Sequence, residues 1–323
     1  MRYSGIGGQA VMEGVMMKNQ EKYAVAVRKP DQEIVVETST YEGLIKKKIR
    51  NMPILRGVFS FIESLVLGMK TLTFSASFFE EEEDEKSGSR KAEKRAGAKK
   101  PAPTEEEQKK KEKRQENVLM GGTVAISIVL AVAIFMVLPY YISVFFQRFI
   151  TSQTLLALLE GVIRLTIFIG YVAAISLMPD IKRVYMYHGA EHKCINCIEQ
   201  GMDLTVENVR KSSRLHKRCG TSFLLIVMLI SIVFFLFIRV DNRILQLLLR
   251  LVLIPVIAGV SYEFIRLAGR SDHMLVNLFS KPGLLLQRIT TREPDDSMIE
   301  VGIASVEAVF DWKAYVKEIR EQA

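Results

Sequence analysis

The chain has 323 residues, of which 49% are hydrophobic and 25% are charged, and its formal net charge is +8. The charges are segregated: residues 118–147 and 220–238 contain none, and dense charged blocks lie outside these runs. About 20 apolar residues cross the hydrocarbon core of a bilayer, so we predict a mainly α, polytopic membrane protein with small cytoplasmic α+β modules. This excludes an ordinary soluble enzyme, and three cysteines are too few for a secreted disulfide scaffold.

Residues 1–51 are predicted to form an N-terminal cytoplasmic module with a β-hairpin. Its strands are the β-type runs 23–28 and 33–39, joined by a turn at Lys29-Pro30-Asp31-Gln32. The preceding segment 5–17 is dense in Gly and Met, and it lacks the Lys-Ser/Thr pair of a phosphate-binding loop. We expect it to form a tight turn packed on the membrane domain.

Segment 52–79 is apolar except for Arg56, Glu63 and Lys70, which recur every seven residues and so share one helical face. This pattern favours an amphipathic or re-entrant helix at the membrane surface. The alternative is a further span whose three charges face the bundle, which would move the N-terminus outside.

A run of six acidic residues at 80–85 opens a Lys/Glu/Ala/Pro-rich segment that extends to 117 and lacks apolar periodicity. We predict a disordered charged linker over 80–117. The alternative is a partner-binding tail.

Four spans are predicted at 118–141, 155–178, 220–238 and 244–262, so that 118–178 and 220–262 form the membrane domain. The loop 179–219 carries eight basic residues, whereas the turn before the second span has only Arg148. By the positive-inside rule, this loop and both termini face the cytoplasm of the inner membrane. The rule and attraction to anionic lipid also explain the net charge, so no nucleic-acid partner is predicted.

Residues 263–323 are predicted to form a C-terminal cytoplasmic module. Pro294, Asp295 and Asp296 can open a helix. Its apolar positions approximate one face, which must dock on another element: Ile299, Ile303, Val306, Phe310 and Ile319. We expect the two cytoplasmic modules to pack together, because each is too short to bury a large core alone.

The cytoplasmic loop contains His188-x-x-Glu191-His192. On a helix, the two imidazoles would lie on one face and could bind one zinc ion, while Glu191 would transfer a proton. His216 and Cys219, at the start of the third span, could complete the site. The alternative is that these polar residues only cap helices near lipid head groups.

Further candidate ligands are Cys197 and Glu263. The Cys194-x-x-Cys197 pair could indicate a redox or structural zinc site, although neither a βαβ context nor a second such pair is present. Glu263 could bind the metal or pair with Arg266.

Five blocks resemble the bacterial YqhQ family: residues 7–17 (GGQAVMEGVMM), 188–193 (HGAEHK), 218–222 (RCGTS), 262–266 (YEFIR) and 287–296 (QRITTREPDD). That family consists of uncharacterised membrane proteins, sometimes described as predicted metal-dependent enzymes. The resemblance implies a small residue at 194 and Pro at 217, where this chain has Cys194 and Lys217. It therefore favours Cys197 and Cys219 over Cys194 as functional thiols.

Two functions remain open. The first is a zinc-dependent hydrolase at the cytoplasmic membrane face, acting on a membrane peptide or a lipid-linked group. The second is a non-enzymatic accessory factor or scaffold, for example in membrane-protein biogenesis, with a structural metal or none. Its partners would be the bilayer and other membrane or cytosolic proteins. Transport is disfavoured because buried charge is sparse.

Overall fold

The computed structural model describes residues 3–43, 52–88, 121–238, 240, 242–271 and 273–322. The chain divides into two compact units, one of Met1–Glu82 with Ile169–Ala323 and the other of Glu83–Phe168. Helices dominate both units, and the first also contains one antiparallel sheet. The predicted mainly α class with a small β element is therefore confirmed.

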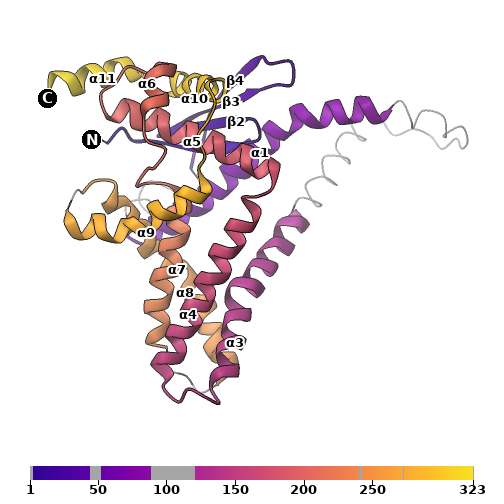
Figure 1. The fold of residues 1–323 in the computed structure, drawn as a ribbon, viewed down its shortest axis with the longest axis vertical. Helices are drawn as coiled ribbons and strands as arrows, with labels where there is room; N and C mark the ends of the chain where they lie inside the picture. The colour runs from indigo at the N-terminus through magenta and orange to yellow at the C-terminus, as the bar shows by residue number, and fades with distance from the viewer. Residues whose placement is uncertain are drawn as a thin grey trace, which may run out of the picture. The chain divides into compact units, whose positions relative to one another are not determined.

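The sheet is a meander in the order β1-β2-β3-β4 (Figure 1). Its strands are β1 (Ile6–Val11), β2 (Gly14–Asn19), β3 (Lys22–Arg28) and β4 (Ile34–Thr40). The predicted hairpin is confirmed as β3–β4. The prediction of only a tight turn at 5–17 is wrong, because this segment forms the hairpin β1–β2, which turns at Glu13 with a φ of 48°. Gly14 is required here, since a Cβ would collide with the carbonyl oxygen of Ala26.

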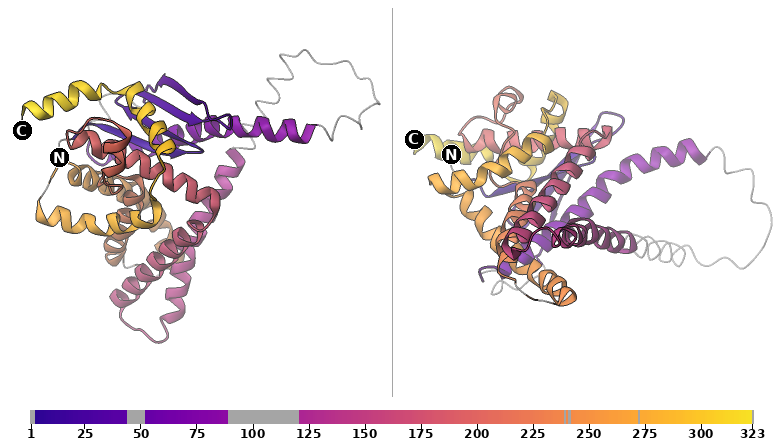
Figure 2. Two further views of the ribbon diagram at one scale, coloured as in Figure 1. Left: turned by 45° about the horizontal axis from the view of Figure 1, so that its top comes forward. Right: turned by 60° about the horizontal axis from the view of Figure 1, so that its bottom comes forward.

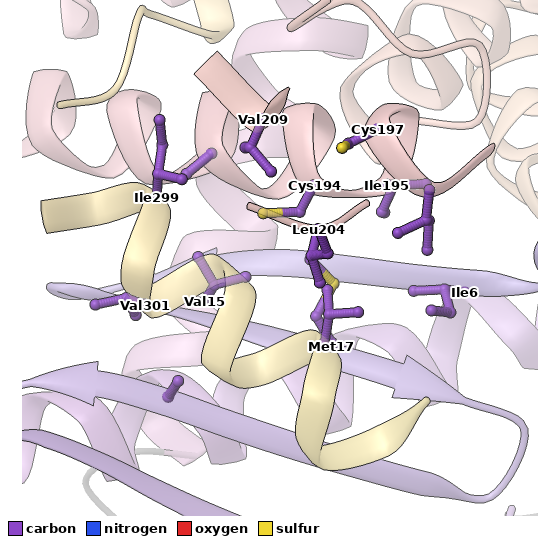
Figure 3. Close-up of a cluster of buried hydrophobic side chains, with 14 of the residues drawn as sticks. Ile6, Val15, Met17, Cys194, Ile195, Cys197, Leu204, Val209, Ile299 and Val301 are labelled. Atoms are coloured by element: carbon purple, nitrogen blue, oxygen red, sulfur yellow. The ribbon is translucent and has the colours of Figure 1, made fainter. Parts of the chain in front are cut away.

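Helices cover both faces of the sheet. On one face lie α5 (Pro179–Glu199) and α10 (Asp296–Val309), side by side in Figures 1 and 2. They share an apolar core with the sheet, shown in Figure 3, which includes Val15, Met17, Ile195, Ile198, Met298 and Ile299. The N-terminal and C-terminal modules thus pack together directly, α10 against β2 and β3, with α5 beside them.

The other face packs on α1 (Leu55–Gly88) through a second apolar cluster. The charged stripe of α1 faces the protein: Arg56 pairs with Glu263, and Lys70 donates to the hydroxyl of Tyr23 at 3.0 Å. The helix continues to Gly88, so the predicted boundary at residue 79 is wrong. Glutamate is a good helix former, which allows the acidic run to prolong the helix. The rest of the predicted linker, 89–117, lies outside the described residues.

Four described helices are long and apolar enough to cross a membrane: Leu55–Phe79, Gly121–Phe146, Gln153–Ile175 and Ile244–Ala268. The number matches the prediction, but the members differ. The α1 segment qualifies, whereas α7 (Gly220–Leu236) has only 17 residues and falls below this length.

In the second unit, helical hydrogen bonding changes before Pro139. A π-helical turn (η2, Ala133–Val137) precedes α3 (Leu138–Phe146). Proline lacks an amide hydrogen, which leaves the carbonyl of Phe135 without its helical donor. Arg164 of α4 (Gln153–Ile175) donates to that carbonyl at 3.0 Å and pairs with Glu160 at 2.5 Å. Glu160 and Arg164 are four residues apart, so their ion pair joins neighbouring turns of α4.

The remaining helices are α6 (Val206–Lys211), α8 (Arg243–Ala268), α9 (Met274–Thr290) and α11 (Trp312–Glu321). The predicted opening of the C-terminal helix is confirmed, since Asp295 accepts a hydrogen bond from the amide of Met298 at 2.9 Å. The prediction of one helix through Ile319 is wrong. The chain breaks after Val309, and Asp311 caps a separate α11. Helix α9 was not predicted.

Candidate metal centre

Helix α5 supplies two imidazoles to the site. Its sequence places His188 and His192 one turn apart, and their ring centroids lie 4.4 Å from each other. The helical placement of the His-x-x-Glu-His motif agrees with the prediction. On the opposite face of the same helix, Cys194 and Ile198 are buried in the apolar core.

Side chains of α5 also hold the loop that leads to Cys219. Lys193 donates to the carbonyls of Arg210 and Ser212, both at 2.9 Å. Asn196 donates to the carbonyl of Leu215 at 3.0 Å. Because these buried donors satisfy loop carbonyls, the loop is bound closely to the helix that carries the histidines.

The end of α9 is the third part of the chain that borders the cluster, after α5 and the loop before α7. Gln287 is fully buried and binds the backbone of His216 twice, accepting from its amide at 2.8 Å and donating to its carbonyl at 2.6 Å. Gln287 also donates to Ser222 in the first turn of α7 at 2.7 Å. This fixes the segment that contains Cys219.

Both imidazoles are oriented by backbone carbonyls. His188 Nδ1 lies 2.9 Å from the carbonyl of Thr290, and His192 Nδ1 lies 2.6 Å from that of Arg214. A carbonyl can only accept, so each Nδ1 carries the proton and each Nε2 is left to bind another group. His188 Nε2 is 3.2 Å from Cys219 Sγ. His188, His192 and Cys219 each offer one donor atom, and these atoms lie within 4.8 Å of one another.

The thiol and the imidazoles shift each other's pKa. Burial would raise the pKa of Cys219, but the charges of His188 and His192 outweigh it and hold the pKa well below its usual value. The amide of Thr221, at the start of α7, also donates to this sulfur at 3.4 Å. Burial would lower the pKa of His188, yet Cys219 raises it to about 9. The site therefore favours the thiolate, which is the form of cysteine that binds metals.

Glu191 lies beside the cluster and faces β1. Burial raises the pKa of its carboxyl, while His192 and His188 oppose that change. A Cβ on Gly8 would approach Glu191 Cγ to 2.7 Å, so a glycine is needed for this packing. Gly189 has a similar role, because a Cβ there would collide with the carbonyl of Arg292.

The other predicted ligands lie outside this three-residue cluster. The ring of His216 is 5.6 Å from that of His192, but His216 Nε2 faces Glu199 at 3.7 Å. Cys197 lies in the apolar core in Figure 3, where its thiol donates to the carbonyl of Asp203 at 3.4 Å. Glu263 forms a two-pronged ion pair with Arg56.

Several positioning residues were not predicted: Gly8, Asn196, Gln287 and Thr290. Three of them, Gly8, Gln287 and Thr290, fall within the sequence blocks that resemble the YqhQ family. That resemblance was the only sign in the sequence that these residues matter. Their roles depend on backbone carbonyls and close approaches that a sequence pattern does not display.

Together these features define a mainly helical protein with membrane-length apolar helices and a buried His–His–Cys cluster. The chain belongs to the family described as "Protein of unknown function (DUF1385)", whose model matches residues 52–312. It is 34% identical over 301 residues to "Uncharacterized protein YqhQ" of Bacillus subtilis (strain 168). The matched region covers 93% of this chain and 90% of that protein. The resemblance to the YqhQ family is thus confirmed. No solved structure matches the chain.

Proposed function

We propose that this protein is a zinc-dependent enzyme, a hydrolase, that acts at the cytoplasmic face of the bacterial inner membrane. His188, His192 and Cys219 would hold the ion, and Glu191 would serve as general base. One observation carries the proposal. Each imidazole donates from Nδ1 to one backbone carbonyl, and its other nitrogen, Nε2, lies in the donor cluster with Cys219. Metal-binding histidines are commonly oriented in this way.

The donor set fits zinc. Nitrogen and thiolate ligands favour zinc over magnesium or calcium, which prefer oxygen. Tetrahedral zinc would separate a nitrogen and a sulfur ligand by about 3.6 Å, and His188 Nε2 lies 3.2 Å from Cys219 Sγ. Three protein ligands leave one tetrahedral position for a substrate or water. When bound, the ion would polarise a substrate oxygen and lower the pKa of a water molecule.

The chain's own residues would supply orientation and proton transfer. The carbonyls of Thr290 and Arg214 accept from Nδ1 of the two imidazoles, so Nε2 is the atom that would bind the ion, with release of any proton it carries. Glu191 is buried beside both histidines but is not one of the three donors. Burial raises the pKa of this carboxyl, and a carboxyl in this position suits a general acid or base.

The membrane location rests on the apolar helices and on the basic residues of loop 179–219. In this proposal Gly121–Phe146, α4, α7 and α8 cross the bilayer, and α1, which packs on the sheet, lies at its surface. By the positive-inside rule, this arrangement puts both termini and the His/Cys cluster on the cytoplasmic side.

A second function, a non-enzymatic accessory factor or scaffold with a structural metal, is favoured by the burial of the cluster. His192 is 1% exposed and Cys219 is 5% exposed, and His188 is half-buried. Structural zinc sites are closed by four protein ligands, whereas catalytic sites keep one position open. Solvent exchange at the bound ion therefore separates the two functions.

The test is the metal content of the purified full-length protein in detergent. We expect about one zinc per chain, and loss of zinc in His188→Ala and His192→Ala. His273→Asn is the matched control, because it removes a histidine that is not among the three donors while keeping a capping acceptor for α9. Glu191→Gln should keep the metal and lose function in the cell. Unchanged metal content in the double histidine variant would refute the proposal.

A further inference from the structure

A second polar feature lies at the junction of five chain segments. A cavity of about 530 Å³ opens between the residue that follows α4, the first half of α5, the loop before α7, the end of α9 and the segment after α9. Its lining residues are Ser176, Lys182, Met186, Arg214, Arg288, Ile289, Arg292 and Glu293.

The lining is strongly basic. It contains four cationic side chains and one carboxylate, Glu293. Glu293 is already engaged by Lys193 at 2.9 Å and by Arg214 at 3.2 Å. Within the part of the chain that the structure describes, no carboxylate pairs with Lys182, Arg288 or Arg292. The cavity therefore holds an excess of positive charge that no carboxylate of the described residues neutralises.

The wall of the cavity is fixed by the fold. Arg292 donates through Nη2 to the carbonyl of Ser176 at 3.0 Å, and its amide donates to the carbonyl of Tyr185 at 2.8 Å. The Nε of Arg292 is buried and has no acceptor among the described residues. The close approach of this segment to Gly189 holds it against α5. The guanidinium is thus positioned without being neutralised.

Helix α9 indicates the surroundings of this cavity. Apart from Leu286, its buried residues are small or polar: Ser280, Gly283, Gln287 and Thr290. Gly283 and Gln287 contact Ser222 at the start of α7. The large apolar residues of α9 are exposed instead: Met274, Leu275, Leu278, Phe279 and Leu285. This arrangement is the reverse of a soluble protein's helix and suits a helix at the edge of a lipid leaflet. The helix runs across the end of α7 rather than along it (Figure 1).

The cavity begins where this apolar surface ends. Arg288 lies in the last turn of α9, and Ser176 directly follows α4, one of the helices of membrane-crossing length. The level at which a helix leaves the hydrocarbon core is also the level of lipid phosphates.

We propose that this cavity binds a phosphate group of an anionic ligand at the membrane surface. Arginine and lysine form strong charge-assisted hydrogen bonds to phosphate oxygens, and the planar guanidinium can bind two oxygens at once. The phosphate could belong to a lipid head group or to a water-soluble compound, and both would make these contacts. The site needs neither the zinc ion nor Glu191, so it stands apart from the proposed function.

The experiment measures binding to the purified full-length protein in an uncharged detergent. The probes are short-chain phosphatidylglycerol, short-chain phosphatidylcholine and inorganic phosphate. Lys182→Gln/Arg288→Gln removes two exposed cations from the cavity. Lys281→Gln/Lys313→Gln removes the same charge from exposed positions, one of them on α9, that do not line the cavity.

The cavity variant should bind phosphatidylglycerol or inorganic phosphate about tenfold more weakly, and the control variant should bind as the wild type does. Preference for phosphatidylglycerol over inorganic phosphate identifies the lipid as the source, and the reverse preference identifies a soluble ligand. Equal binding by the cavity variant and the wild type would overturn the proposal. Equal weakening in the control would also overturn it, because the effect would then be general surface charge. His188→Ala should leave this binding unchanged even if it loses zinc.

Discussion

The two faces of α5 are stabilised in different ways. One face, with Cys194 and Ile198, is buried against the sheet and α10 by apolar contacts. The other face, with His188, His192 and Asn196, binds backbone carbonyls of distant segments. The apolar face fixes where the helix lies, and the polar face uses that fixed position to orient a donor cluster. Substitutions on the two faces should therefore have separable effects on stability and metal content.

The largest loss of stability is expected from the apolar side. Ile299 of α10 is fully buried in the core shared with α5. Ile299→Ala would leave a cavity and lower the free energy of unfolding by about 2–5 kcal/mol. Thermal unfolding in detergent measures this. Val36→Ala, at an exposed position on β4, is the control and should change stability by no more than about 0.5 kcal/mol. The metal content of the folded Ile299→Ala protein should stay at the wild-type level, and its loss would show that the two faces are not separable.

Gly189→Ala is expected to destabilise the protein less than Ile299→Ala does, but to reduce its metal content. The new methyl group would collide with the carbonyl of Arg292 and displace the segment that carries Thr290. We expect about 1–3 kcal/mol of destabilisation, as for other overpacked sites, and zinc content well below that of the wild type. Gly170→Ala is the matched control, since a Cβ at Gly170 meets no atom within 4 Å. A Gly189→Ala protein with full zinc content would contradict the positioning role of this segment.

The effect confined to the narrowest range of conditions is a pH dependence that arises next to the site. Burial would raise the pKa of Glu199, but His216, Arg218 and the Ser4 amide lower it to about 2. Because the folded pKa lies below that of the unfolded chain, ionised Glu199 stabilises the fold above about pH 4.3. This contribution, on the order of 2 kcal/mol, is lost as the pH falls toward 2. Between these pH values, the free energy of unfolding should depend less steeply on pH in Glu199→Gln than in the wild type. An equal slope in the two proteins would show that Glu199 does not contribute to the pH dependence.

Local patterns were predictable from the sequence. The hairpin β3–β4 follows from its strand runs and turn, and the helical spacing of His188 and His192 follows from the motif itself. The hairpin β1–β2 was missed because its glycines suggested a turn. At least one of these glycines is needed because of a residue far away in the sequence: Gly8 leaves room for Glu191 of α5.

The choice among the candidate ligands was not predictable. Cys197 shares a helix with the histidines but points into the core, whereas Cys219 reaches them through a loop held by Asn196 and Gln287. The sequence left open whether Glu263 binds a metal or pairs with Arg266. Its main partner in the structure is Arg56, which is far away in the sequence. Side-chain direction and distant partners are set by tertiary packing, which spacing alone does not encode.

The most direct test of the His–His–Cys centre is the zinc X-ray absorption spectrum of the purified full-length protein. We predict one sulfur at about 2.3 Å and nitrogen ligands at about 2.0–2.1 Å. Cys219→Ser should remove the sulfur signal, whereas Cys194→Ser and Cys197→Ser should retain it. A zinc shell of oxygen and nitrogen alone in the wild type, or a sulfur signal that survives in Cys219→Ser, would contradict the assignment of Cys219 as a ligand.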